Sequence, residues 1–219
     1  MSSQRRFLLY ADRNDGVCVI RTYCATEPGT YRLACFPHFT EYPSRYQRLS
    51  GQLLPGVEVL SFQYMEHLPD GTPAHIRDVV DLADQCLREL LDWTDLPLAL
   101  IGHRGGAYLA LLVAQRLEHR FGVTPSTLFV ADRAAPSEAE RREWRKPSCR
   151  IVALTGDASP SGHATAAAWR ECTSGPFDLE LFPGSRQFPY DDSSLVNLIH
   201  DQLLSLPNPA LPLSAMRGD

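Results

Sequence analysis

The chain of 219 residues lacks the features that mark membrane proteins, metal sites and nucleic-acid binders. No stretch approaches the roughly 20 apolar residues of a membrane-spanning helix, and the apolar run near the N-terminus is too short for a signal peptide. The six cysteines (18, 24, 35, 86, 149 and 172) form no Cys-x-x-Cys pair or Cys/His cluster, and the net charge of −5 attracts neither nucleic acid nor anionic membranes. We therefore predict a cytoplasmic protein with reduced thiols and without metal or cofactor. A disulfide between Cys18 and Cys24 is the alternative, and the oligomeric state stays open.

Apolar runs and amphipathic segments alternate along the chain. After an extended segment around Val17–Thr22, the predicted strands are Tyr31–Phe36, Val57–Tyr64, Leu98–Gly102, Thr127–Ala131, Arg150–Thr155 and Phe177–Phe182. The predicted helices are Ile76–Leu91 with Pro73 near its first turn, Ala107–Leu117 ending at Phe121-Gly122, Ala164–Glu171 and Ser193–Leu204. Near-continuous apolar strands that alternate with helices indicate an α/β fold, a mainly parallel sheet with helices on both faces. We expect a single domain over residues 1–206 and a flexible, proline-rich tail over 207–219.

A serine is missing where a strand runs into a helix. The apolar run Leu98–Ile101 leads into Gly102-His103-Arg104-Gly105-Gly106, the setting in which a nucleophile elbow presents the serine of Gly-x-Ser-x-Gly. Arg104 takes that central position, and a guanidinium stays protonated and has no usable lone pair. The sequence thus predicts the fold of an acyl hydrolase without its usual serine chemistry.

Short motifs in a fixed order cover nearly the whole chain after the first thirty residues. They are Arg32-Leu33-Ala34-Cys35-Phe36-Pro37-His38, Pro55-Gly56-Val57-Glu58, Ile101-Gly102-His103, Leu128-Phe129-Val130-Ala131-Asp132-Arg133-Ala134-Ala135-Pro136-Ser137, Ala153-Leu154-Thr155-Gly156-Asp157 and Phe182-Pro183-Gly184. The ordered set resembles the type II thioesterases that accompany polyketide and nonribosomal peptide synthases. The resemblance implies an α/β-hydrolase domain that removes acyl groups from the phosphopantetheine arm of carrier proteins.

The catalytic positions depart from this family pattern. Where the family has its Ser, Asp and His, this sequence has Arg104, Ser159 and Arg186. The loop after Phe-Pro-His, which in the family continues Ala-Gly-Gly toward the oxyanion, reads Phe39-Thr40-Glu41, and Glu41 would oppose negative charge there. Because the triad acts as a unit, we predict that serine-dependent hydrolysis is lost.

The family's long helical lid is also reduced. Only the thirteen residues from Ser137 to Cys149 fill the gap before the next strand, enough for one short charged helix such as Glu138–Trp144. Lids exclude water and enclose the substrate. The shortened segment therefore predicts an open groove suited to a protein surface or a large ligand.

Arg104, at a predicted helix N-terminus, and Arg186 form a candidate binding site for a phosphate or a carboxylate. The alternative is that Arg104 pairs with Glu41 or Asp157 and only fills the old pocket.

Three histidines also fall near the candidate site. His38 and His103 are expected to orient or pack beside it rather than to act as catalysts. His163 follows the position of the lost aspartate and is, with Asp157 and Glu41, a candidate for proton transfer; a solvent-facing histidine at a helix start is its simpler interpretation.

These observations leave three functions open. The favoured one is an auxiliary component of natural-product biosynthesis that binds an acyl or peptidyl carrier protein, or a partner enzyme, without hydrolysis. The second is a repurposed cyclase, isomerase or lyase in which Arg104 and Arg186 stabilise an enolate or carboxylate. The third is residual thioester hydrolysis by a relocated serine such as Ser159 or Ser161.

Overall fold

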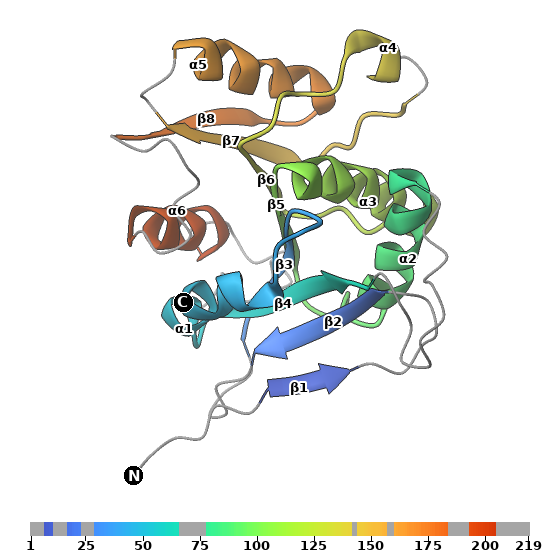
Figure 1. The fold of residues 1–219 in the computed structure, drawn as a ribbon, viewed down its shortest axis with the longest axis vertical. Helices are drawn as coiled ribbons and strands as arrows, with labels where there is room; N and C mark the ends of the chain where they lie inside the picture. Colours follow the sequence, from blue (N-terminus) through green and yellow to red (C-terminus); the bar gives the residue numbers. More distant parts are fainter. Residues whose placement is uncertain are drawn as a thin grey trace, which may run out of the picture.

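The fold is built on one eight-stranded sheet (Figure 1). The computed structural model describes residues 7–10, 17–22, 29–65, 78–141, 144–156, 160–183 and 193–204. The strands are β1 (Phe7–Tyr10), β2 (Val17–Thr22), β3 (Tyr31–Phe36), β4 (Val57–Tyr64), β5 (Leu98–His103), β6 (Thr127–Ala131), β7 (Arg150–Gly156) and β8 (Phe177–Phe182). Their spatial order is β1-β2-β4-β3-β5-β6-β7-β8. The six strands from β4 to β8 in this order pair in parallel, whereas β1 and β2 pair antiparallel at one edge.

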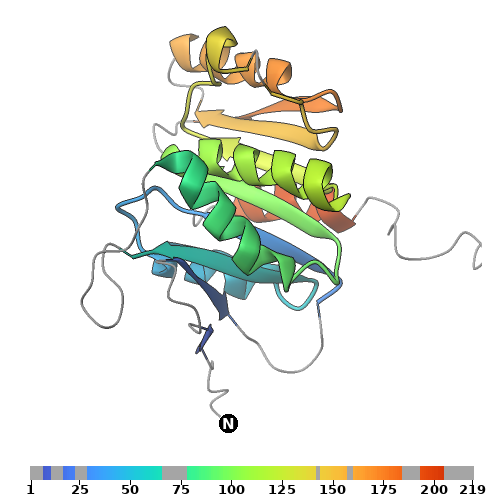
Figure 2. The ribbon, with the colours of Figure 1, turned by 90° about the vertical axis from the view of Figure 1, so that its right-hand side faces the viewer.

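Helices cover both faces of the sheet (Figure 2). They are α1 (Gln47–Leu53), α2 (Val79–Leu91), α3 (Gly105–Phe121), α4 (Glu138–Arg141), α5 (Pro160–Ala167) and α6 (Ser193–Leu204), with short 3-10 helices η1 (Pro43–Tyr46) and η2 (Ala168–Cys172). Strand residues alternate between two cores: Ala34 and Phe36 pack with α2 and α3, while Leu33 and Cys35 pack with α1 and α6. The predicted α/β fold, a parallel sheet buried on both faces, is confirmed.

Every strand predicted from the sequence is present, to within one residue. Three helix starts differ from prediction, and the smallest difference is at α3, which begins at Gly105 instead of Ala107. Helix α2 begins at Val79 because the extended Asp78 caps it, accepting hydrogen bonds from the N–H groups of Val80 and Asp81; Pro73 and Ile76 lie outside the described residues. The predicted helix Ala164–Glu171 starts earlier, at Pro160, and tightens into η2 from Ala168.

Four elements were not predicted or are shorter than predicted. β1, η1 and α1 were not predicted. β1 and η1 have only four residues each, and α1 buries only a narrow stripe around Leu49 and Leu53. The predicted charged helix after Ser137 ends at Arg141. Residues 132–149 join β6 to β7, and the described part of this connection contains no helix longer than the four residues of α4.

Cys35, Cys86, Cys149 and Cys172 are buried free thiols, and burial raises the pKa of the Cys149 thiol to about 12. Such a thiol is protonated and unreactive at neutral pH. Cys24 and the tail 207–219 lie outside the described residues, so the disulfide and the tail stay predictions. No helix in the described part of the chain is both long and apolar enough to span a bilayer.

Candidate functional site

A strained turn joins β5 to α3. Arg104 stands between the end of β5 at His103 and the start of α3 at Gly105, with φ 50° and ψ −117°. A positive φ is costly for a side chain that is not glycine and persists only where the surroundings impose it. The Arg104 N–H donates to the Ala131 carbonyl at 2.9 Å, and the Arg104 carbonyl accepts from the Ala107 N–H at 3.0 Å. The turn has the backbone shape of a nucleophile elbow with arginine at its apex.

Two glycines make this turn sterically attainable. A Cβ on Gly102 would lie 2.4 Å from the Ala107 Cα, and a Cβ on Gly106 would lie 2.0 Å from the Phe36 carbonyl oxygen. Both contacts are with backbone, which cannot move aside without shifting a strand or a helix. The glycine spacing that predicted the elbow is thus required by close backbone packing.

The Arg104 side chain is exposed and lies at the mouth of a cavity. No ion pair or hydrogen bond joins its guanidinium to any residue in the described part of the chain. The predicted alternative of an Arg104–Glu41 pair is therefore not found; the other candidate partner, Asp157, lies outside the described residues. An exposed guanidinium at the first turn of a 17-residue helix is a suitable place for an anion.

Glu41 contacts His103 instead. The buried imidazole lies between two carboxylates, with Nδ1 3.1 Å from Glu41 Oε2 and Nε2 3.2 Å from Asp132 Oδ2. Both contacts are hydrogen bonds at the same time only when both ring nitrogens carry a proton. Glu41 Oε2 also accepts from the His38 backbone N–H at 3.2 Å. His103 therefore ties the loop after β3 to the ends of β5 and β6, and its orienting role at the site stays a prediction.

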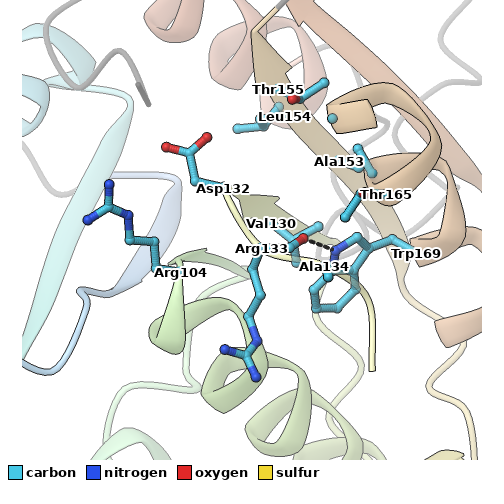
Figure 3. Close-up of a pocket in the computed structure, with 12 residues that line it drawn as sticks. Arg104, Val130, Asp132, Arg133, Ala134, Ala153, Leu154, Thr155, Thr165 and Trp169 are labelled. Atoms are coloured by element: carbon cyan, nitrogen blue, oxygen red, sulfur yellow. Dashed lines mark hydrogen bonds between the residues drawn. The ribbon is translucent and has the colours of Figure 1, made fainter. Parts of the chain in front are cut away.

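The cavity beside the turn has a volume of about 380 Å³ and opens at the carboxyl ends of β5, β6 and β7 (Figure 3). Polar groups of Arg104, Asp132, Arg133 and Thr155 line it together with the Trp169 ring. The Trp169 indole N–H donates to the Arg133 carbonyl at 2.9 Å and anchors the segment after β6. In Figure 3 the Arg104 and Arg133 side chains leave the rim in different directions, Arg133 running beside α3. The Arg104 guanidinium therefore lies at the mouth of the cavity, whereas the Arg133 guanidinium lies over the Tyr108 ring, 5.3 Å from its centroid.

Aromatic side chains cover the start of α3. The Phe39 ring lies so close to Gly105 that a Cβ there would be 2.6 Å from Phe39 Cε2. The centroid of the Phe39 ring lies 5.6 Å from that of the His38 ring and 5.9 Å from that of the Tyr64 ring. His38 Nδ1 is buried and has no hydrogen-bond partner among the residues that the structure describes. In an acyl hydrolase the N–H group of the residue after the nucleophile helps to hold an oxyanion, and here the Phe39 ring packs beside that residue, Gly105.

The remaining predicted site residues fall outside the cavity or outside the described residues. His163 lies half-buried on α5 and is not among the residues that line the cavity. Asp157, Ser159 and Arg186 lie outside the described residues, so their roles stay predictions. No group of three or more His, Cys, Asp or Glu side chains placed to hold a metal ion occurs in the described ranges.

Sequence reasoning missed Asp132 and Arg133 as site residues. Asp132 has φ 51° and directly follows the buried strand β6. Polar residues at the carboxyl end of a parallel strand point toward the ligand crevice of such sheets, and this signal could have identified both.

Known proteins are similar to this chain in sequence and in fold. A family profile described as a thioesterase domain matches residues 31–155. Thioesterase PikA5 of Streptomyces venezuelae is 29% identical, over 84% of this chain and 85% of that protein. A thioesterase assigned to cadicidin biosynthesis in Streptomyces griseus is 28% identical, over 88% of this chain and 67% of its own length. The solved structure of BorB, the type II thioesterase of the borrelidin biosynthetic cluster, is 27% identical with a TM-score of 0.71, covering 85% of this chain and 96% of that one.

The matched profile spans more than half of the chain, and it contains the turn at Arg104 and the strands that position it. The chain belongs to the thioesterase family and has its α/β-hydrolase fold.

Proposed function

We propose that this protein serves natural-product biosynthesis, of the polyketide or nonribosomal peptide type, by binding a carrier-protein-linked intermediate without hydrolysing it. The observation that carries the proposal is the exposed Arg104 guanidinium at the apex of the elbow, without an ionic partner among the described residues. Biosynthetic roles in the names of its relatives support the pathway context.

Serine-type acyl transfer needs a nucleophile at the elbow, and arginine cannot supply one. Its guanidinium is protonated at every physiological pH and offers no electron pair to a thioester carbonyl. The Phe39 ring packed against Gly105 also disfavours serine-type hydrolysis. The replacement of the family's Asp and His by Ser159 and Arg186 disfavours it further. Because the members of the triad act as a unit, we expect that a chain without any of them does not turn over a thioester.

The retained groups are suited to holding an anion. Arg104 brings a positive charge to the mouth of the cavity, where the N-terminus of α3 adds its dipole, and Arg133 adds a second cation at the rim. The Asp132 carboxylate contacts His103, with Oδ2 3.2 Å from Nε2. The phosphate of a phosphopantetheine arm and a carboxylate of the acyl group share the chemistry that these cations recognise.

A binding assay with a loaded carrier protein tests the proposal. Native mass spectrometry is expected to show a complex with acyl-phosphopantetheinyl carrier protein in which the acyl mass stays unchanged. Arg104→Ala is expected to weaken the complex by about tenfold to a hundredfold, since a hydrogen bond to a charged group contributes about 1.5–3 kcal/mol. A carrier loaded with an uncharged acyl group and one loaded with a carboxylated acyl group distinguish recognition of the phosphate from recognition of the acyl carboxylate.

Arg170→Ala is the matched control, because Arg170 is exposed on η2 and its guanidinium contacts only the Phe177 ring among the described aromatic residues. Release of free acid above the background rate would contradict the proposal, as would equal affinities of the Arg104→Ala and Arg170→Ala variants.

The His103 contacts favour one second candidate, a non-hydrolytic enzyme in the same groove. Asp132 both lines the cavity and contacts a buried imidazole, which places a carboxylate–histidine pair next to Arg104. Such a pair can move a proton while the cation stabilises an enolate. Conversion of the bound acyl group to an isomer or cyclised product, abolished by Arg104→Ala in a folded protein, would select this candidate over simple binding.

A further inference from the structure

A second cavity lies along α2 and α3, and its lining on α3 begins at Tyr108, about one helical turn after Arg104. It has a volume of about 300 Å³, and Val80, Tyr108, Arg116, Arg120, Trp144 and Arg145 line it. We call it the α3 groove. It follows α3 from Tyr108 to Arg120, about 18 Å at 1.5 Å per residue, which is the length of roughly three turns of a docked helix.

The α3 groove is positively charged in a chain whose net charge is −5. Arg116 Nε and Arg120 Nη1 lie 2.9 and 2.8 Å from the same Asp84 oxygen. The Arg145 side chain is exposed and forms no ion pair with a described residue. Arg116 and Arg120 thus share the Asp84 carboxylate, and Arg145 adds a third guanidinium to the groove. This positive charge is complementary to an acidic partner.

The groove also has an apolar floor. Val80 is 47% exposed, and the rings of Tyr108 and Trp144 lie with centroids 5.6 Å apart. Aromatic side chains surrounded by arginines are typical of the centre of a protein interface. An apolar side chain of a docked helix can pack on this floor while its acidic neighbours contact the arginines.

Arg133 connects the α3 groove to the elbow cavity. Its guanidinium lies over the Tyr108 ring, 5.3 Å from the centroid. Tyr108 lines the α3 groove and Arg133 lines the elbow cavity. A group that leaves the α3 groove at Tyr108 therefore meets the Arg133 guanidinium at the rim of the elbow cavity.

We propose that the α3 groove docks an acidic helix of the carrier protein, so that its phosphopantetheine arm passes Arg133 and enters the elbow cavity. This inference rests on the proposed function and specifies the protein surface that the partner uses. Docking through the groove does not need the arm, whereas Arg104 contacts only what the arm brings.

Calorimetric titration with a carrier domain in its apo form, without the arm, and its holo form, with the arm, separates the two contributions. The double variant Arg120→Glu/Arg145→Glu is expected to weaken binding of the apo form at least tenfold and to reduce its salt dependence. The control Arg48→Glu/Arg170→Glu makes the same change in net charge at two exposed positions on α1 and η2, and we expect less than a twofold effect. Arg145→Glu alone, at an exposed side chain, repeats the test should the double variant not fold.

Equal affinities of the groove variant and the control would overturn the inference. Binding of the holo form without binding of the apo form would overturn it as well and leave the proposed function intact, whereas failure of both forms to bind would remove both. Self-association of the wild-type chain that the groove variant loses, in place of carrier binding, would assign the groove to a second copy and contradict the proposal.

Discussion

Arg32→Ala is expected to lower the free energy of unfolding by about 3–5 kcal/mol, the cost of removing one partner of a buried ion pair. The Arg32 side chain is 7% exposed and donates from Nε to Glu58 at 2.6 Å, while the Glu58 side chain is 8% exposed. Its Nη1 donates to the Trp93 carbonyl at 2.9 Å and to Asp95. Burial lowers the pKa of Arg32, but the hydrogen bonds to Asp95 and Glu58 outweigh it and raise that pKa overall. The variant would leave the Glu58 carboxylate buried without its guanidinium.

Urea denaturation followed by circular dichroism measures this difference. Asp95→Ala is the control, since the Asp95 side chain is 66% exposed and an exposed ion pair contributes about 0–1 kcal/mol. Similar losses for the two variants would contradict the prediction, because the buried pair with Glu58 would then add nothing beyond the exposed pair with Asp95.

Gly106→Ala is expected to cost about 3 kcal/mol of stability, at the upper end of the usual range for overpacking. The added Cβ would lie 2.0 Å from the Phe36 carbonyl oxygen and 2.6 Å from the Pro37 carbonyl oxygen. Both are backbone atoms at the end of the buried strand β3, so α3 must move away from the sheet to admit the methyl group. That movement would also disturb the turn at Arg104, and we expect weaker carrier binding along with the lower melting temperature.

Gly56→Ala is the matched control for this glycine. Among the described residues its added Cβ would meet only the Leu204 side chain, at 3.6 Å, so we expect a change within about 0.5 kcal/mol. Equal stabilities of the Gly106→Ala and Gly56→Ala proteins would show that α3 packs less tightly on β3 than the distances indicate.

These contacts explain how an arginine can hold a conformation suited to a nucleophile. The glycines and the Arg104–Ala131 hydrogen bond impose the turn from outside, and the side chain at its apex takes no part in them. Backbone strain of this kind is compensated by the surrounding packing. The elbow is consequently a scaffold on which different side chains can be presented.

Much of this architecture could be predicted because its signals are local. Continuous apolar runs identified the strands, helical spacing with Gly122 at its end identified α3, and Gly102-His103-Arg104-Gly105-Gly106 identified the turn between them. Weakly patterned elements such as β1 and α1 escaped prediction, and α2 starts later than its apolar spacing indicated because Asp78 caps it.

The sequence by itself determined the layered sheet, the family resemblance and the absence of a serine at the elbow, because each depends on residues that are neighbours along the chain. Only the tertiary structure decided that Glu41 contacts His103 instead of Arg104, that Asp132 and Arg133 line the cavity, and that Arg133 links it to the α3 groove. Such contacts join side chains from loops and strand ends far apart in the sequence. Their partners depend on how the sheet twists and where its strands end, which no local pattern encodes.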